Sequence, residues 1–115
     1  MTETIISMEL PAGGHLAIRR NRICPEHETK QCRRISLVSG IHGDELEGQY
    51  ICYETARRVK EHPEYLKGIV DIYPALNPLG IDMASRTVPR LDMDMNRMFP
   101  GDASGDMMER ITATV

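Results

Sequence analysis

The sequence predicts an α/β fold, and the order of its apolar segments supports that prediction. The stretch "ISLVSGI" is dense in β-branched and apolar residues, as a central strand would be, and "GIVDIYPAL" supplies another strand. Between them, from about Asp44 to His62, the residues follow a helical pattern that Pro63 would end. A strand, a helix and a strand in this order form a βαβ unit, so we expect the two strands to pair in parallel.

Two more strands are predicted at the start of the chain. The segments "TIISMEL" and "HLAIRRNRI" flank "PAGG", a turn rich in Pro and Gly. The sheet should therefore open with a β-hairpin.

The predicted helix has one apolar and one charged side. The apolar side, expected against the sheet, gathers Leu46, Tyr50, Cys52, Tyr53, Ala56 and Val59. On the opposite side Glu54 and Arg58 lie one turn apart, where they can form an ion pair.

Composition excludes several classes of function. The net charge is −3, and no basic cluster exceeds paired arginines, which gives no basis for nucleic-acid binding. No apolar run approaches the roughly 20 residues that a membrane helix needs, and no signal peptide is recognisable, so we expect a cytoplasmic protein. Three cysteines, an odd number, fit a reduced compartment better than a disulfide framework.

The stretch "CPEHETKQC" offers one alternative metal site. Cys24, His27 and Cys32 lie close together in it, but a zinc site there needs a fourth ligand, and the spacing is not that of a zinc finger. We expect a solvated loop.

The last third of the chain has a different character. From Asn77 to Gly105 it is rich in Pro, Gly, Asp and Arg with little periodicity, and irregular stretches of this length are usually functional. Asp106 and Glu109 have the spacing of a capping box, which predicts a helix start. Because that helix has no closing element before Val115, we expect residues 1–115 to form the N-terminal part of a larger catalytic domain.

The first chemical motif is His42-x-x-Glu45, at the carboxyl end of the predicted central strand, where open α/β sheets bind ligands. A hydrolytic zinc ion takes about three protein ligands and one water, and His and Glu three positions apart at a helix start can converge on one ion. The alternative is a helix that opens with acidic residues beside an unrelated histidine.

The second motif is "RLDMDMNRMFPG", which places Arg90, Asn96 and Arg97 in one loop. Arginine matches carboxylates with two parallel hydrogen bonds, so the loop suits a substrate that carries a free carboxylate. Alternatively, Asp92 and Asp94 neutralise these arginines in structural ion pairs.

In this order, "SGIHGDELEG", "ALNPLG" and "DMDMNRMFPG" resemble the succinylglutamate desuccinylase/aspartoacylase family, within the zinc carboxypeptidase-like superfamily. The resemblance implies a mixed sheet with flanking helices and a Zn²⁺ cofactor held by His42 and Glu45. It further implies that Asn96 and Arg97 hold the substrate carboxylate. Arg90 is the candidate for the arginine that stabilises the oxyanion, with Arg86 as its competitor.

The same resemblance exposes a departure from the family pattern, in which the third zinc ligand and the general-base glutamate come later in the chain. After Arg97 this sequence has no histidine, and its one glutamate is Glu109. We therefore expect an amidohydrolase that cleaves an N-acyl amino acid or similar small amide, with the 115-residue chain itself inactive. The alternatives are a carboxypeptidase that acts on peptide C-termini and a non-catalytic interaction fragment. A homo-oligomer is left open.

Overall fold

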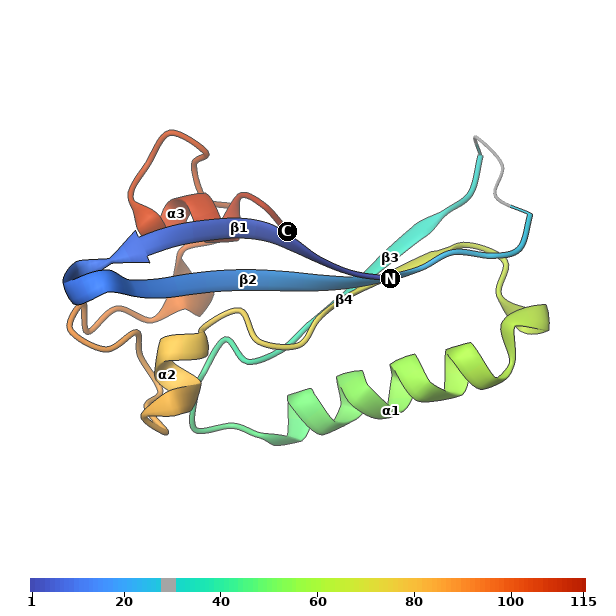
Figure 1. Ribbon diagram of the computed structural model, residues 1–115, viewed down its shortest axis with the longest axis horizontal. Helices are drawn as coiled ribbons and strands as arrows, with labels where there is room; N and C mark the ends of the chain where they lie inside the picture. Colours follow the sequence, from blue (N-terminus) through green and yellow to red (C-terminus); the bar gives the residue numbers. More distant parts are fainter. Residues whose placement is uncertain (28–30) are drawn as a thin grey trace.

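A four-stranded mixed sheet organises the computed structural model, which describes residues 1–27 and 31–115. Its strands are β1 (Thr2–Leu10), β2 (Gly14–Ile23), β3 (Arg34–Val38) and β4 (Ile69–Tyr73), in the spatial order β1-β2-β4-β3 (Figure 1). β2 pairs antiparallel with both β1 and β4, whereas β3 and β4 are parallel. These pairings confirm the predicted α/β class, the opening hairpin and the parallel βαβ unit.

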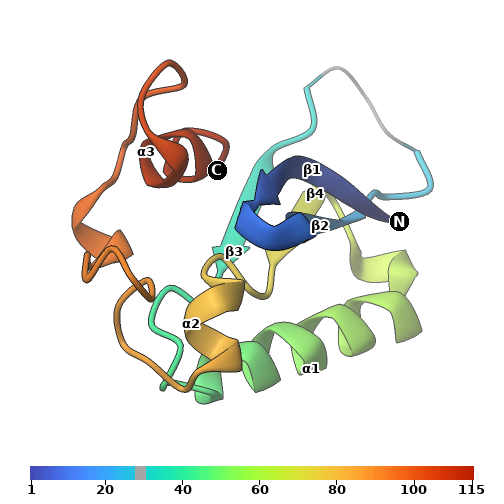
Figure 2. The same ribbon diagram turned by 60° about the vertical axis from the view of Figure 1, so that its left-hand side comes forward.

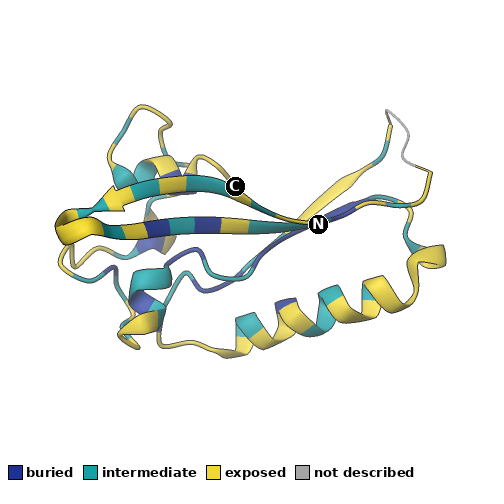
Figure 3. Cartoon of the chain, in the orientation of Figure 1, coloured by how far each residue is buried: buried dark blue, intermediate teal, exposed yellow. Residues whose placement is uncertain are grey.

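Helix α1 (Glu47–Glu61) covers one side of the sheet, but it buries a narrower face than the sequence suggested. Cys52 is buried with Ile23, Val70 and Ile72, and Ala56 and Val59 pack against this cluster. The expectation that Leu46, Tyr50 and Tyr53 share that face is wrong, since all three are at least 60% exposed. Successive residues of a helix are rotated by about 100° around its axis. When Cys52, Ala56 and Val59 pack against the sheet, the stripe of Leu46, Tyr50 and Tyr53 therefore faces solvent, on the exposed side of α1 in Figure 3.

The helix also begins later than predicted, at Glu47 rather than near Asp44. Gly43 is buried, its N–H donates to the carbonyl of Ser85 at 2.8 Å, and this contact holds the preceding residues in a turn. Asp44 and Glu45 therefore lie in a loop before the helix. The predicted ion pair between Glu54 and Arg58 is present, at 3.5 Å.

The other side of the sheet carries a second core, which packs helix α3 (Met107–Thr112) against the hairpin (Figure 2). Its buried members are Leu16, Ile18, Leu76, Val88, Met95, Met108 and Ile111. The predicted capping box at the start of α3 is confirmed, with Asp106 and Glu109 each bonded to the backbone of the other.

The segment from Asn77 to Gly105 is irregular for most of its length, as predicted. It contains the short helix α2 (Pro78–Asp82), a single 3₁₀ turn (Met95–Arg97) and an isolated bridge between Val88 and Met93. Among the described residues, no helix is long and apolar enough to cross a membrane.

Candidate active site

The loops that follow β3 and β4 meet at the carboxyl ends of these two parallel strands. The N–H of Ser39 donates to the carbonyl of Tyr73 at 2.9 Å, and the N–H of Asn77 donates to the carbonyl of Gly40 at 2.7 Å. Gly40 adopts a left-handed conformation with φ of 65°, and a Cβ there would lie 2.9 Å from the Cα of Ala75. A glycine is needed here because the chain must turn sharply against its neighbour.

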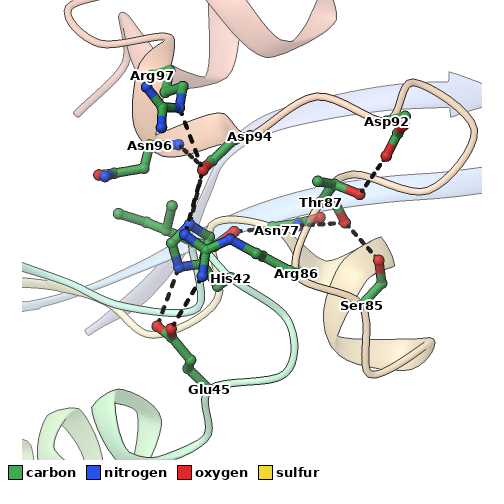
Figure 4. Close-up of polar contacts among 11 residues, drawn as sticks. His42, Glu45, Asn77, Ser85, Arg86, Thr87, Asp92, Asp94, Asn96 and Arg97 are labelled. Carbon is green, nitrogen blue, oxygen red and sulfur yellow. Dashed lines mark hydrogen bonds and ion pairs between the residues drawn. The ribbon is translucent and has the colours of Figure 1, made fainter.

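His42 lies between two carboxylates that contact opposite nitrogens of its ring (Figure 4). Its Nδ1 is 3.2 Å from Oε2 of Glu45, and its Nε2 is 2.9 Å from Oδ1 of Asp94. The side chain of His42 is 11% exposed and that of Asp94 is 16% exposed, whereas Glu45 faces solvent. The ring is therefore held from both ends, with its more accessible edge toward Glu45.

This arrangement shifts the protonation equilibria of the pair. The hydrogen bond with Asp94, supported by that with Glu45, raises the pKa of His42 above its ordinary value despite partial burial. The hydrogen bond with His42, helped by the backbone N–H of Asn96, lowers the pKa of Asp94. Without a metal, both shifts therefore favour the charged forms of His42 and Asp94.

Two arginines border this cluster. Arg86 lies 3.7 Å from a carboxylate oxygen of Glu45 and 3.6 Å from one of Asp94, so its guanidinium spans the two acids. Arg97 approaches Asp94 at 3.8 Å, and its side chain is 84% exposed. The alternative that Asp94 neutralises an arginine is thus partly realised, although both contacts are long and partly solvated, where ion pairs contribute little.

A cavity of about 340 Å³ opens beside the cluster, bordered by His42, Glu45 and Asn96. Asn96 reaches this position because the side chain of Asp94 caps its N–H at 3.0 Å and starts the 3₁₀ turn. The structure therefore brings together His42, Glu45 and Asn96 around one space, with Arg97 next in the chain.

Arg90 lies in different surroundings. It adopts a left-handed conformation with φ of 71° and lines an apolar groove with Leu10, Leu79 and Leu91. That groove shares no lining residue with the cavity beside His42. Within the described residues, Arg90 makes no ion pair with the acids of the cluster, a position that Arg86 holds.

Asp94 is the member of the cluster whose role the sequence did not reveal. It was considered only as an ion-pair partner of arginines, yet it bonds the imidazole of a residue 52 positions earlier. No local spacing encodes a contact over that separation.

The remaining candidates do not complete a metal site. Over the described ranges 1–27 and 31–115, no group of three or more His, Cys, Asp and Glu residues is arranged to hold an ion. Part of the stretch from Cys24 to Cys32 lies outside the described residues, so that alternative stays a prediction. Glu109 is engaged in the cap of α3, where its Oε2 accepts from the N–H of Asp106 at 2.9 Å.

The fold and the cluster define a class: an α/β protein with a histidine, two carboxylates and arginines at the carboxyl ends of parallel strands. Residues 31–115 match the model of the succinylglutamate desuccinylase/aspartoacylase catalytic domain, and the chain belongs to this family. An N-alpha-acetyl-L-2,4-diaminobutyric acid deacetylase of Halomonas elongata is 36% identical over 75 residues, which are 65% of this chain and 21% of that protein.

Solved structures of relatives confirm the fold. A succinylglutamate desuccinylase/aspartoacylase of Rhodobacter sphaeroides matches 97% of the chain with a TM-score of 0.75 and 28% identity. An aspartoacylase family protein of Mesorhizobium loti matches 99% with a TM-score of 0.74 and 26% identity. The ectoine utilization protein EutE of Ruegeria pomeroyi, solved with bound product, matches 98% with a TM-score of 0.75 and 25% identity. In each case the chain spans 34% of the relative's length.

Proposed function

We propose that this chain supplies part of the active site of a zinc-dependent amidohydrolase that removes the acyl group from an N-acyl amino acid or a similar small carboxylated amide. Family membership supports the reaction class, as does the resemblance to a deacetylase of an acetylated diamino acid. The observation that carries the proposal is the position of His42, with Glu45 at one ring nitrogen and Asp94 at the other.

The two proposed ligands fit a zinc ion. Tetrahedral zinc with ligands at about 2.1 Å separates neighbouring donor atoms by roughly 3.4 Å. Nδ1 of His42 and Oε2 of Glu45 are 3.2 Å apart, so a small adjustment would let both hold one ion. A zinc ion bound there would lower the pKa of a coordinated water and polarise the scissile carbonyl.

In this proposal Asp94 orients the ligand. A carboxylate at Nε2 keeps the ring proton on that nitrogen and leaves the lone pair of Nδ1 for the metal, as metal-binding histidines generally require. The contact of 2.9 Å between Nε2 and Oδ1 has the length of a good hydrogen bond.

For the developing negative charge of the reaction we propose Arg86 rather than Arg90. Its guanidinium already lies within 4 Å of carboxylate oxygens of Asp94 and of Glu45, and Glu45 borders the cavity. Preorganised donors at such a position stabilise the transition state more than the ground state. Arg90 lines a separate groove.

Asn96 and Arg97 are the proposed clamp for the substrate carboxylate. Asn96 borders the cavity, and the guanidinium of Arg97 is exposed, with one long contact to Asp94. A guanidinium with most of its donors available can give a carboxylate two parallel hydrogen bonds.

Metal binding tests the proposal directly. After equilibrium dialysis against zinc, the wild-type chain should bind one ion weakly, because two ligands leave half of the coordination sphere to water. The His42→Ala variant should lose this binding, while the His15→Ala variant, changed at an exposed histidine, should keep it. Stoichiometric zinc retained by His42→Ala would place the metal elsewhere.

Hydrolysis tests the substrate class. A catalytically active form of the protein should release the acyl group from N-acetyl amino acids and spare analogues that lack the free carboxylate. The 115-residue chain should show no turnover, because the third zinc ligand and the general-base glutamate of the family pattern are not among its residues. Catalytic groups that act as a unit lose most of their effect when one of them is missing. Preferential cleavage of peptide C-termini would instead favour a carboxypeptidase.

A further inference from the structure

Asn77 is a buried amide at the junction of three segments of the site. It is 1% exposed and follows β4, and its backbone N–H donates to the carbonyl of Gly40 in the loop after β3. A buried amide must satisfy both its donors and its acceptor within the protein, so its position depends on all its partners together.

The side chain of Asn77 reaches a different segment with each bond. Its Nδ2 donates to the carbonyl of Ile41 at 3.2 Å and to the carbonyl of Thr87 at 3.4 Å. Its Oδ1 accepts from the N–H of Gly80 at 2.9 Å and so caps helix α2. One side chain therefore ties the loop after β3, the start of α2 and the loop after α2. Figure 4 shows Asn77 beside Thr87 of the last of these segments.

Both carbonyls that receive Nδ2 adjoin residues of the proposed active site. Ile41 immediately precedes His42, and Thr87 immediately follows Arg86. The same amide thus anchors the backbone on which the proposed zinc ligand sits and the backbone on which the proposed oxyanion arginine sits.

The contact between Gly43 and Gly80 makes this junction tight. A Cβ on Gly43 would lie 2.0 Å from the backbone carbon of Gly80, so the two backbones touch where any side chain would force them apart. The N–H of Gly43 also donates to Ser85 at 2.8 Å. Loops packed in this way can shift only together or by breaking their shared bonds.

We propose that Asn77 is a positioning residue, which sets the distance and orientation of the His42 loop relative to the Arg86 loop. The catalytic meaning of this inference rests on the proposed function, but the coupling of the loops does not. Loss of the two Nδ2 bonds would loosen the His42 loop relative to the Arg86 loop, with the bond from Gly43 to Ser85 left to join them. A misplaced metal ligand weakens metal binding by about 10- to 100-fold, as seen when supporting groups of metal sites are removed.

Asn77→Asp is the sharpest perturbation. It keeps the size of the side chain and the acceptor for Gly80, but it places a carboxylate oxygen against the carbonyls of Ile41 and Thr87. The matched control is Asp71→Asn, the reverse exchange at another fully buried position of the same strand region. Asp71 bonds Arg22 through both carboxylate oxygens at 2.7 Å and contacts none of the site loops in the described bonds.

Amide hydrogen exchange measured by NMR is the readout, because it separates local opening from global unfolding. In Asn77→Asp, the N–H groups of Gly43 and Gly80 should exchange about tenfold or more faster relative to the amides of α1, which contains neither exchanged residue, since two buried hydrogen bonds are lost. In Asp71→Asn this ratio should not change, whatever the loss of global stability. An equal ratio in the two variants would overturn the inference.

The wild-type chain gives an independent test if Asn77→Asp fails to fold. The N–H groups of Gly43, Asn77 and Gly80 should open as one unit, with a common opening free energy. Distinct values for the three would show that the loops move separately and would overturn the coupling.

Zinc titration of the same variants distinguishes the failure of this inference from that of the proposed function. If the wild-type chain binds no zinc, the proposed metal site fails while the exchange experiment still decides the coupling. If the wild type binds zinc and Asn77→Asp binds it equally well, the metal site stands and the positioning role is refuted.

Discussion

Replacing Asp94 with Asn should weaken zinc binding even though the size of the side chain hardly changes. Oδ1 of Asp94 accepts from the ring of His42 at 2.9 Å and from the N–H of Asn96 at 3.0 Å. An asparagine with its amide oxygen at this place can accept both bonds, but a neutral oxygen holds the proton on Nε2 less firmly than a carboxylate does, and its amide nitrogen would then lie against the guanidinium groups of Arg86 and Arg97. With the amide reversed, its nitrogen would donate to Nε2 and so favour the tautomer with the proton on Nδ1, which is the nitrogen proposed to hold the metal.

The expected magnitude follows from the charge-assisted hydrogen bond to His42 that is lost. A hydrogen bond to a charged group contributes about 1.5–3 kcal/mol. Since about 1.4 kcal/mol corresponds to a tenfold change in affinity, the loss is about 10- to 150-fold. Asp94 is 16% exposed, so solvent screens part of this energy, and we expect a value at the lower end, about tenfold.

Competition between the protein and a chromophoric chelator, at fixed pH and ionic strength, measures this change. Asp92→Asn is the matched control, because Asp92 lies in the same loop and accepts a bond from Thr87 at 3.3 Å rather than from His42. Equal zinc affinity in the two variants would refute the role of Asp94. The metal-free variants should also be compared by circular dichroism, so that a folding defect is not mistaken for a weakened metal site.

Three further outcomes are expected. Because the pKa of His42 is raised, its ion pairs stabilise the metal-free chain below the ordinary pKa and lose that effect as the pH rises through the raised value. The free energy of unfolding in urea should therefore differ more between wild type and His42→Gln at low pH than at high pH, and a difference that does not change with pH would contradict this expectation. Leu76→Ala should lower the free energy of unfolding by about 2–5 kcal/mol because Leu76 is completely buried, whereas Tyr50→Ser, at a residue 67% exposed, should change it by less than about 0.5 kcal/mol. In a catalytically active form, Arg97→Lys should raise KM for carboxylated substrates by about ten- to a hundredfold, because an ammonium cannot give two parallel hydrogen bonds; equal losses on substrates without the carboxylate would disprove the clamp.

The sequence by itself determined the features that depend on neighbouring residues. The hairpin around "PAGG", the two parallel strands and the capping box of Asp106 and Glu109 were all predicted and are all present. Each is encoded within a few residues, by turn chemistry, by apolar patterning or by a bond across one helical turn. The motif from His42 to Glu45 was equally visible, because its two members lie three positions apart.

Only the tertiary structure decided which distant groups meet. The pattern of α1 contained two apolar stripes, and the packing of the sheet selected the one through Cys52 while it left Tyr50 and Tyr53 in solvent. The spacing of "SRTVPRLDMDMNR" left Arg86 and Arg90 as alternatives, and the turns of the loop bring Arg86 to the acids of the site. The bond between His42 and Asp94 spans 52 residues, and its partners meet because the ends of two parallel strands and an irregular loop converge, which no local pattern records.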